Sequence, residues 1–375
     1  MGKEKLSLKD MMFNKQRVTF LSGLIKEAYK EFDEVNFIDD VLVKFPELEL
    51  KERIYHIKDN LKIYLPDNYK LAVSIMRQSL PPELDPNKTD DDFGYFILSS
   101  FGEYIAEYGC NGEYLDFSLS NFEEFTKRFS MEFAIRPFLK KYPEQTLVYV
   151  EEWSKHDNYH VRRFASEGIR PSLPWGGKVD IGIQNTFDVL DNLFSDHTSY
   201  VFRSVANNMN DISKIDPIGV LSKLDEWKKS RKQSEKNMDY IMRHSLRTLL
   251  RSGHKESLQF IGYQKPDISI KNFQILTPSV SLGESLKFEF EIDSKNDQVL
   301  MIDYIIHFVK ASGKNSGKTF KISKKKIGKG ENIKITKKHP LREMTTLKLY
   351  PGKHFIELQI NGEKFGKIEF DFKMN

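Results

Sequence analysis

The strongest constraint on the fold is a change in hydrophobic period near residue 264. Before this point, apolar residues recur at helical spacing in segments separated by short turns. From Pro266 onward they alternate with polar residues, as in SVSLGESLKFEFEI and KHFIELQINGEKF. Since the two periods belong to different secondary structures, the sequence predicts a helical domain over residues 1–264 and an all-β domain over residues 265–375.

The helical part also repeats itself. Arg163, Arg203 and Arg243 are spaced by 40 and 40 residues and lie in the similar contexts YHVRRFA, SYVFRSV and DYIMRHS. A period near 40 built from helix pairs is typical of HEAT or armadillo arrays, in which equivalent positions of successive repeats line one concave face. We therefore expect an α-solenoid of HEAT-like helical repeats, which no convincing strand interrupts.

The C-terminal part predicts about seven short strands with turns at regular intervals. Asn361 and Gly362 stand between two alternating runs, which is a strong hairpin signal. This pattern indicates a C-terminal all-β immunoglobulin-like sandwich. It would lack the usual disulfide, because Cys110 is the only cysteine of the chain.

Several features favour a reducing, cytoplasmic location. A single cysteine allows neither an intrachain disulfide nor a cysteine-based zinc site, and we expect no metal and no cofactor. The opening MGKEKLSLKD lacks the apolar core of a signal peptide. The apolar run over residues 299–309 is too short to span a membrane and contains Asp303 and His307.

One segment, VRRFASEGIRPSLPW over residues 161–175, concentrates unusual side chains. Arg163, Glu167 and Arg170 fall on one helix face, and Pro171 then ends the helix. A second proline leads to Trp175 at the end of a short, stiff loop. An upstream segment, RFSMEFAIRP over 128–137, also places a glutamate before Ile-Arg-Pro, and SVANNMNDISK follows over 204–214.

In this order and spacing, EFAIRPF, VRRFASEGIRPSLPW and SVANNMNDISK resemble the AlkC family of bacterial DNA alkylation-repair glycosylases. DYIIHFVKASG, KKHPLRE and LYPGKHFIELQING resemble the immunoglobulin-like domain that some members carry. The resemblance covers nearly the whole chain, more loosely over the first 90 residues. It implies a base-excision glycosylase that removes cationic 3-methyladenine and 3-methylcytosine from double-stranded DNA. The protein would be a bacterial cytoplasmic monomer, associated with the nucleoid when bound to DNA.

Carried over by motif, the resemblance implies an active site of Glu132, Phe133, Arg163, Trp175 and Asp211. A base methylated at N3 is already cationic and leaves as a neutral molecule, so positive charge develops on the deoxyribose instead. Glu132 or Asp211 would stabilise that charge and orient water. Trp175 would offer a π face to a cation, Phe133 would form a flat, dry wall, and Arg163 would grip a phosphate.

Four of these residues also have a purely structural explanation: a helix cap for Glu132, an ion pair with Lys214 for Asp211, a bridge to Glu167 for Arg163, and a place in the core for Trp175. We interpret Glu167 and Arg170 as structural residues that hold Trp175 in place. The stiffness of the segment would then position Trp175 and Arg163 against damaged DNA.

Charge is unevenly distributed along the chain. Residues 266–375 hold 20 Lys/Arg against 13 Asp/Glu, a net of +7, whereas the whole chain has a net charge of +4. This indicates an anionic partner, or equally a solvated lysine edge that discourages sheet aggregation. The resemblance implies a DNA clamp opposite the solenoid, at the minor groove, with HPLR as an apolar tip bearing an arginine. The predicted DNA contacts are Arg162, Arg203, Lys214, Lys324, Lys325, Lys326, Lys338, His339 and Arg342, with the lysines at 329, 334 and 337 as further phosphate contacts.

Three other readings remain open at this point. A non-catalytic HEAT scaffold would bind DNA or protein and need neither Glu132 nor Asp211. A helical glycoside hydrolase could use the same carboxylates, but would favour several tryptophans along a cleft, and the chain has three. A repair-family member could also have become a binder of DNA structure, against which the intact carboxylates argue.

Overall fold

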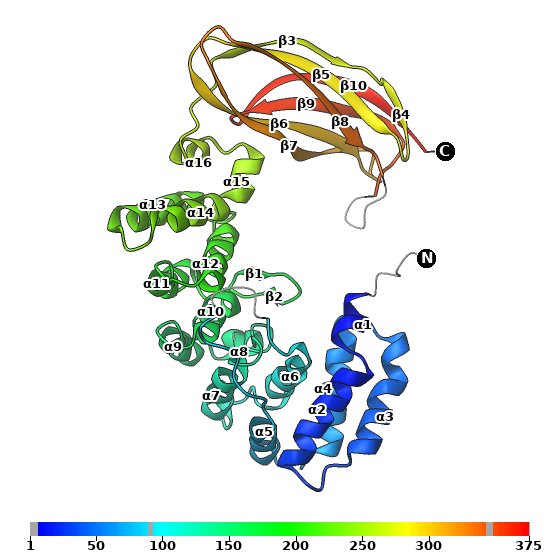
Figure 1. Cartoon of the computed structure of the whole chain (residues 1–375), viewed down its shortest axis with the longest axis vertical. Coiled ribbons are helices and arrows are strands. Elements are labelled where there is room, and N and C mark those ends of the chain that lie inside the picture. The colour runs from blue at the N-terminus through cyan, green and yellow to red at the C-terminus, as the bar shows by residue number, and fades with distance from the viewer. Residues whose placement is uncertain (1–6, 89–92, 343–347, 375) are drawn as a thin grey trace. The chain divides into compact units, whose positions relative to one another are not determined.

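The computed structural model describes residues 7–88, 93–342 and 348–374, and it divides into two compact units, Met1–Ser245 and Leu246–Asn375. The predicted order, helical repeats followed by an all-β immunoglobulin-like sandwich, is confirmed (Figure 1). The sequence pattern changes at residue 264, between the last helix and the first strand of the second unit. That unit begins earlier, at Leu246, and includes two short helices, α15 (Arg247–Ser252) and α16 (Lys255–Phe260).

The first unit consists mainly of helices joined by short turns. Its α-helices are α1 (Leu8–Met12), α2 (Lys15–Ala28), α3 (Glu34–Lys44), α4 (Leu50–Tyr64), α5 (Tyr69–Gln78), α6 (Ser99–Tyr108), α7 (Leu115–Thr126), α8 (Arg136–Lys141), α9 (Pro143–Trp153), α10 (Tyr159–Gly168), α11 (Ile183–Leu193), α12 (Ser199–Ile212), α13 (Pro217–Ser230) and α14 (Glu235–Ser245). Two 3₁₀ turns, Phe45–Glu47 and Phe96–Leu98, precede α4 and α6.

Consecutive helix pairs account for the 40-residue period. The pairs are α9 with α10, α11 with α12, and α13 with α14. Helices α10, α12 and α14 pack side by side as the second members of their pairs (Figure 1). Arg163, Arg203 and Arg243 therefore occupy equivalent positions in three repeats. Pro143 and Pro217 take the first positions of α9 and α13, where a proline loses no helical hydrogen bond.

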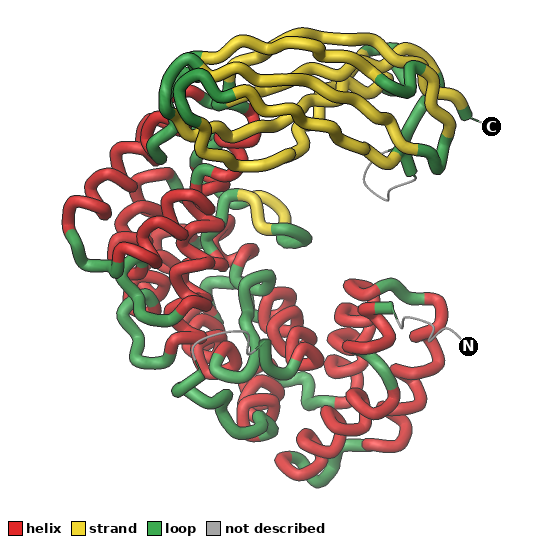
Figure 2. Tube along the Cα trace, turned by 45° about the horizontal axis from the view of Figure 1, so that its top comes forward, coloured by secondary structure: helices red, strands yellow, loops and turns green. Residues whose placement is uncertain are grey.

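The expectation that no strand interrupts the helical region was wrong. A short antiparallel hairpin, β1 (Ser172–Leu173) and β2 (Gly177–Lys178), separates α10 from α11, and Figure 2 shows it projecting from the helices. Strands of two residues are too short for an alternating pattern to be visible in the sequence. The helices are also interrupted at Leu246, where α14 ends and α15 begins one residue later.

The second unit is a two-sheet sandwich. Its strands are β3 (Ile268–Ile275), β4 (Ser279–Ser281), β5 (Ser285–Ser294), β6 (Gln298–Val309), β7 (Asn315–Ile327), β8 (Asn332–Pro340), β9 (Gly352–Ile360) and β10 (Glu363–Lys373). One sheet has the order β4-β10-β9-β6-β7 and the other β3-β5-β8. The β4–β10 pair is parallel and the other pairs are antiparallel. Strands β7 and β8 lie at sheet edges.

Alternation along the strands builds the sandwich core. On β5, Leu286, Phe288 and Phe290 point inward and are fully buried. The predicted Asn-Gly turn is confirmed, because Asn361 and Gly362 connect β9 to β10 with φ angles of 45° and 80°. Both angles are positive, as a two-residue hairpin of the I′ type requires.

Candidate active site

Charged side chains from three separate segments form one continuous chain of ion pairs. They come from the loop before α8, from α10 and the residues after it, and from the end of α12. Each residue of the following series forms an ion pair with the next: Glu132, Arg163, Glu167, Arg170, Asp211 and Lys214. Signs alternate along this series, so each charge has a partner of the opposite sign. Burial of so many charges is stable only when they are paired in this way.

The first half of the network is centred on Arg163. Its guanidinium contacts the carboxylate of Glu132 and donates to Ser130 Oγ at 2.8 Å. Ser130 in turn donates to Glu132 at 2.6 Å. The contact between Arg163 and Glu167 is longer, at 3.7 Å. The guanidinium carbon also lies 4.9 Å from the ring centroid of Tyr200. Arg163 therefore holds Glu132 more closely than it holds Glu167.

The second half is centred on Arg170. It donates to Glu167 Oε1 at 2.6 Å, while its Nε and Nη2 atoms both lie 2.9 Å from Asp211 Oδ2. The other oxygen of Asp211 is 2.9 Å from Lys214 Nζ. Ser204 adds a hydrogen bond to Glu167 Oε2 at 2.6 Å. The Asp211 carboxylate is thus fixed between two cations at the end of α12.

These contacts set the charge states within the network. Burial alone would raise the pKa of Glu167, but the positive charges of Arg163 and Arg170 outweigh it and hold that pKa below its ordinary value. Burial would likewise lower the pKa of each arginine, and the neighbouring carboxylates raise it instead. Glu167, Arg163 and Arg170 are therefore all charged at neutral pH.

The hairpin after α10 presents Trp175 to solvent. Gly176 N donates to Leu173 O at 3.0 Å, closing a turn around Pro174 and Trp175. Trp175 has a φ of 65°, a backbone conformation that usually requires glycine. Its side chain is 60% exposed, so it is not a core residue. Strained positions of this kind cluster at functional sites, where the surrounding structure enforces them.

Arg136 is a site residue that the sequence did not single out. It is buried, and its guanidinium donates to three backbone carbonyls: Gly168 O at 3.0 Å, Arg170 O at 3.0 Å and Gly177 O at 2.6 Å. Burial, followed by the charge of Arg170, lowers the pKa of Arg136 to about 10. Arg136 therefore ties the end of α10 to the hairpin. The available signal was the Ile-Arg-Pro triplet, which occurs at 135–137 and again at 169–171.

A second overlooked residue, Lys51, comes from the distant helix α4. Its Nζ donates to the backbone carbonyl of Trp175 at 2.5 Å. The same atom lies 5.7 Å from the ring centroid of Phe133 and 5.9 Å from that of Tyr55. Lys51 thus brings α4, Phe133 and the hairpin together.

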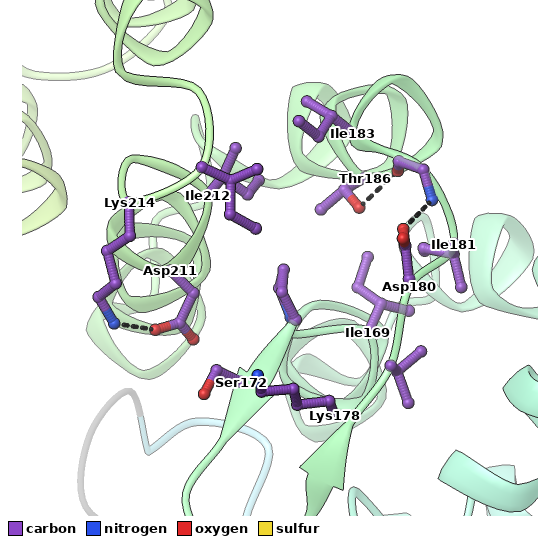
Figure 3. A pocket seen from close by; sticks show the side chains of 14 residues that line it. Ile169, Ser172, Lys178, Asp180, Ile181, Ile183, Thr186, Asp211, Ile212 and Lys214 are labelled. Atoms are coloured by element: carbon purple, nitrogen blue, oxygen red, sulfur yellow. Dashed lines mark hydrogen bonds and ion pairs between the residues drawn. The ribbon is translucent and has the colours of Figure 1, made fainter.

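A pocket of about 560 Å³ lies beside the Asp211 carboxylate. The residues that follow α10, residues 178–183 and the end of α12 supply mainly apolar walls. Asp211 and Lys214 stand on one side of the pocket, with Asp180 and Thr186 on the opposite side (Figure 3). Its volume is within the range of small-molecule sites.

The other residues that were predicted to contact DNA differ in how far they are exposed. Arg162 is paired with Asp196 at 2.5 Å, and Arg203 is half-buried on α12. In the second unit, Lys324, Lys325, Lys326, Lys338 and Arg342 are exposed. His339, by contrast, is buried and hydrogen-bonded to Tyr304 at 2.8 Å, and burial lowers its pKa to about 4. His339 therefore belongs to the sandwich core in this structure and not to an exposed tip.

Within the described residues, no group of three or more histidine, cysteine or carboxylate side chains is arranged to hold a metal ion. In the same part of the chain, none of the helices has the length and apolar character needed to traverse a lipid bilayer.

Comparisons with known proteins cover both units. Residues 269–374 match the family model described as the C-terminal Ig-like domain of uncharacterised protein YhaZ. "Uncharacterized protein YhaZ" of Bacillus subtilis (strain 168) is 35% identical over 364 residues, covering 96% of this chain and 98% of that protein. The structure of Pseudomonas fluorescens alkylpurine DNA glycosylase AlkC, bound to DNA containing an abasic site analog, superposes with a TM-score of 0.86. It is 30% identical, and the match covers 98% of this chain and 100% of that one.

Proposed function

Because this chain belongs to the AlkC family, together with YhaZ of Bacillus subtilis, we propose that it is a DNA glycosylase that excises cationic N-methylated bases from alkylated DNA. One observation carries the proposal. Two carboxylates, Asp211 and Glu132, are each held by an arginine, and an exposed Trp175 lies on a strained turn in the same region. The proposed substrates are 3-methyladenine and 3-methylcytosine in double-stranded DNA.

The proposed chemistry depends on a carboxylate that stabilises positive charge more than on a group that donates a proton. A base methylated at N3 carries its own positive charge and departs as a neutral molecule, so little proton donation is required. Cleavage of the glycosidic bond builds positive charge on the deoxyribose, as in glycoside hydrolysis. A carboxylate held in a fixed position stabilises that charge without reorganising. We assign this role to Asp211, which lines the pocket, and propose that Asp211 or Glu132 also orients the attacking water.

The remaining site residues take supporting roles in this proposal. The Trp175 indole would stack on the cationic base or sugar, a contact worth roughly 0.5–2 kcal/mol. Phe133 would form part of the dry wall. Arg163 is already engaged with Glu132 and Glu167, so a phosphate contact would require it to release them. We therefore propose that its first role is to hold Glu132.

Mass spectrometry of bases released from methylated DNA tests this function directly. We expect the purified protein to release 3-methyladenine or 3-methylcytosine from duplex DNA treated with a simple methylating agent. Binding of the same DNA without release of any base would overturn the glycosylase proposal and favour a non-catalytic scaffold.

We also propose that the lysine-rich edge of the sandwich binds DNA phosphates. Lys324, Lys325 and Lys326 are exposed on the edge strand β7, and Lys338 is exposed on the edge strand β8. Within the described residues these four lysines form no side-chain ion pair, although Lys324 Nζ lies 5.5 Å from the ring centroid of Tyr263. When lysines bind DNA phosphates, counterions are released from the DNA, so the affinity falls as the salt concentration rises.

Changing Lys324, Lys325 and Lys326 together to glutamate is expected to weaken DNA binding and to flatten its salt dependence. Each lost phosphate contact should lower the slope of log K against log salt by about 0.9. Fluorescence anisotropy with labelled duplex DNA at several salt concentrations measures both quantities. The control changes Lys364, Lys367 and Lys373, which are exposed on β10, to glutamate. An equal loss in the control would mean that overall charge, and not this edge, governs binding.

A further inference from the structure

We propose that Lys51 is a positioning residue for base excision: it fixes the turn that carries Trp175 and sets the indole in relation to Phe133. Lys51 is the second residue of α4 and lies 124 positions before Trp175 in the sequence. Its ammonium group donates to the Trp175 carbonyl at 2.5 Å and lies 5.7 Å from the Phe133 ring centroid. This inference rests on the proposed glycosylase function, in which Trp175 and Phe133 form the aromatic surface.

The hairpin needs external support at both of its ends. Its ladder has only the pairs Ser172 with Lys178 and Leu173 with Gly177, and a hairpin this short is not stable by itself. Arg136 holds the base of the hairpin through the carbonyl of Arg170 at 3.0 Å, and it also binds the carbonyl of Gly177, next to the turn, at 2.6 Å. Lys51 holds the tip through the carbonyl of Trp175. That tip has a left-handed backbone at a large, exposed side chain, so it would relax readily if the hydrogen bond were lost.

Neighbouring groups keep the Lys51 ammonium in this place. The rings of Tyr55 and Phe133 both lie within 6 Å of Nζ, at 5.9 and 5.7 Å, which is the range of cation–π attraction. On α6, burial raises the pKa of Glu103, and the charges of Lys51 and Lys58 act in the opposite direction. The lysine therefore lies among two aromatic faces and the Trp175 carbonyl.

The test compares Lys51→Met and Lys51→Arg in the wild-type chain and in a Trp175→Ala background. Methionine keeps the length of the side chain without the charge or the donor, whereas arginine keeps both. We expect Lys51→Met to lower the single-turnover rate of base release roughly 10- to 100-fold, and Lys51→Arg to restore most of it. In the Trp175→Ala background, Lys51→Met should have no further effect, because the two residues act through one contact.

A matched control comes from the same helix. Lys62 lies near the end of α4 and pairs with the exposed Asp67 at 3.1 Å, so Lys62→Met makes the same chemical change away from the hairpin. It should leave the rate unchanged. If Lys51→Met slows release equally in both backgrounds, its effect does not pass through Trp175 and the inference is overturned.

A second measurement does not depend on activity. In protein labelled with 5-fluorotryptophan, fluorine NMR distinguishes Trp175 from Trp153 and Trp227, which are buried. Lys51→Met should shift or sharpen the Trp175 resonance alone, and Lys51→Arg should restore it. An unchanged Trp175 resonance would overturn the positioning role. If the wild-type protein releases no base but the resonance shifts as expected, the proposed function fails while the contact between Lys51 and the hairpin stands.

Discussion

Replacing Asp211 with asparagine is expected to slow the release of methylated bases roughly 10²–10³-fold, the usual cost of losing one preorganised electrostatic contact in an active site. Asparagine preserves the shape of the side chain and removes its negative charge. The positive charge that develops on the deoxyribose would then face Arg170 and Lys214 without the carboxylate between them. DNA binding should be kept or slightly strengthened, since one negative charge is lost near a polyanion.

Single-turnover excision with enzyme in excess measures this effect separately from binding. The matched control is Asp188→Asn on α11, an exposed carboxylate that accepts a hydrogen bond from the neutral amide of Gln184. We expect the control to excise at the wild-type rate. Wild-type rates in Asp211→Asn would show that its carboxylate does not stabilise the transition state. Glu132 would then be the remaining candidate among the two predicted carboxylates.

Local spacing in the sequence predicts some of these contacts and misses others for a physical reason. The Arg163–Glu167 and Asp211–Lys214 pairs, i,i+4 and i,i+3, were both anticipated as structural alternatives, and both are present. The closer partner of Arg163 is Glu132, 31 residues away, and Asp211 is bound by Arg170 from 41 residues away. These partners meet because consecutive repeats stack, and single-sequence periodicity does not determine how one repeat is rotated on the next.

The residues that support the hairpin were the hardest to foresee. Arg136 and Lys51 both donate to backbone carbonyls. Every residue has a backbone carbonyl, so the type of the accepting residue does not reveal such a bond. Trp175 could be placed at the end of a stiff loop from the two prolines that precede it, although a core position was an open alternative. Its positive φ angle and its exposure were not predictable from composition.

In the sandwich, the period-two alternation along β8 already indicated the position of His339. Ile333, Ile335, Lys337 and His339 share one phase along β8, and Ile335 is a core residue. Extending the same alternation places His339 inward, where it is found, and leaves Lys338 outward. The HPLR segment was instead interpreted by its resemblance to exposed minor-groove tips. The alternation of buried and exposed residues therefore continues to the end of β8, which places His339 in the core.

Replacing Glu167 with alanine is expected to lower the free energy of unfolding of the helical unit by roughly 3–5 kcal/mol, the typical cost of removing one partner from a buried ion pair. Glu167 is 5% exposed and binds Arg170 and Ser204 at 2.6 Å each, so its loss leaves buried donors without an acceptor. The matched control, Glu151→Ala, breaks an exposed i,i+4 pair with Lys155 and should cost at most about 1 kcal/mol.

The effect should also depend on pH in a defined direction. The pKa of Glu167 is held below its ordinary value of 4.5 in the folded state, so its stabilisation is complete above that pH. The difference between wild type and Glu167→Ala should therefore be largest near pH 7 and should shrink as the pH falls below about 4.5 through the lower folded pKa. Urea unfolding followed by circular dichroism at several pH values measures it. A difference that matches the Glu151→Ala control, or that grows in acid, would mean that the buried ion pairs of Glu167 do not stabilise the repeats around the site.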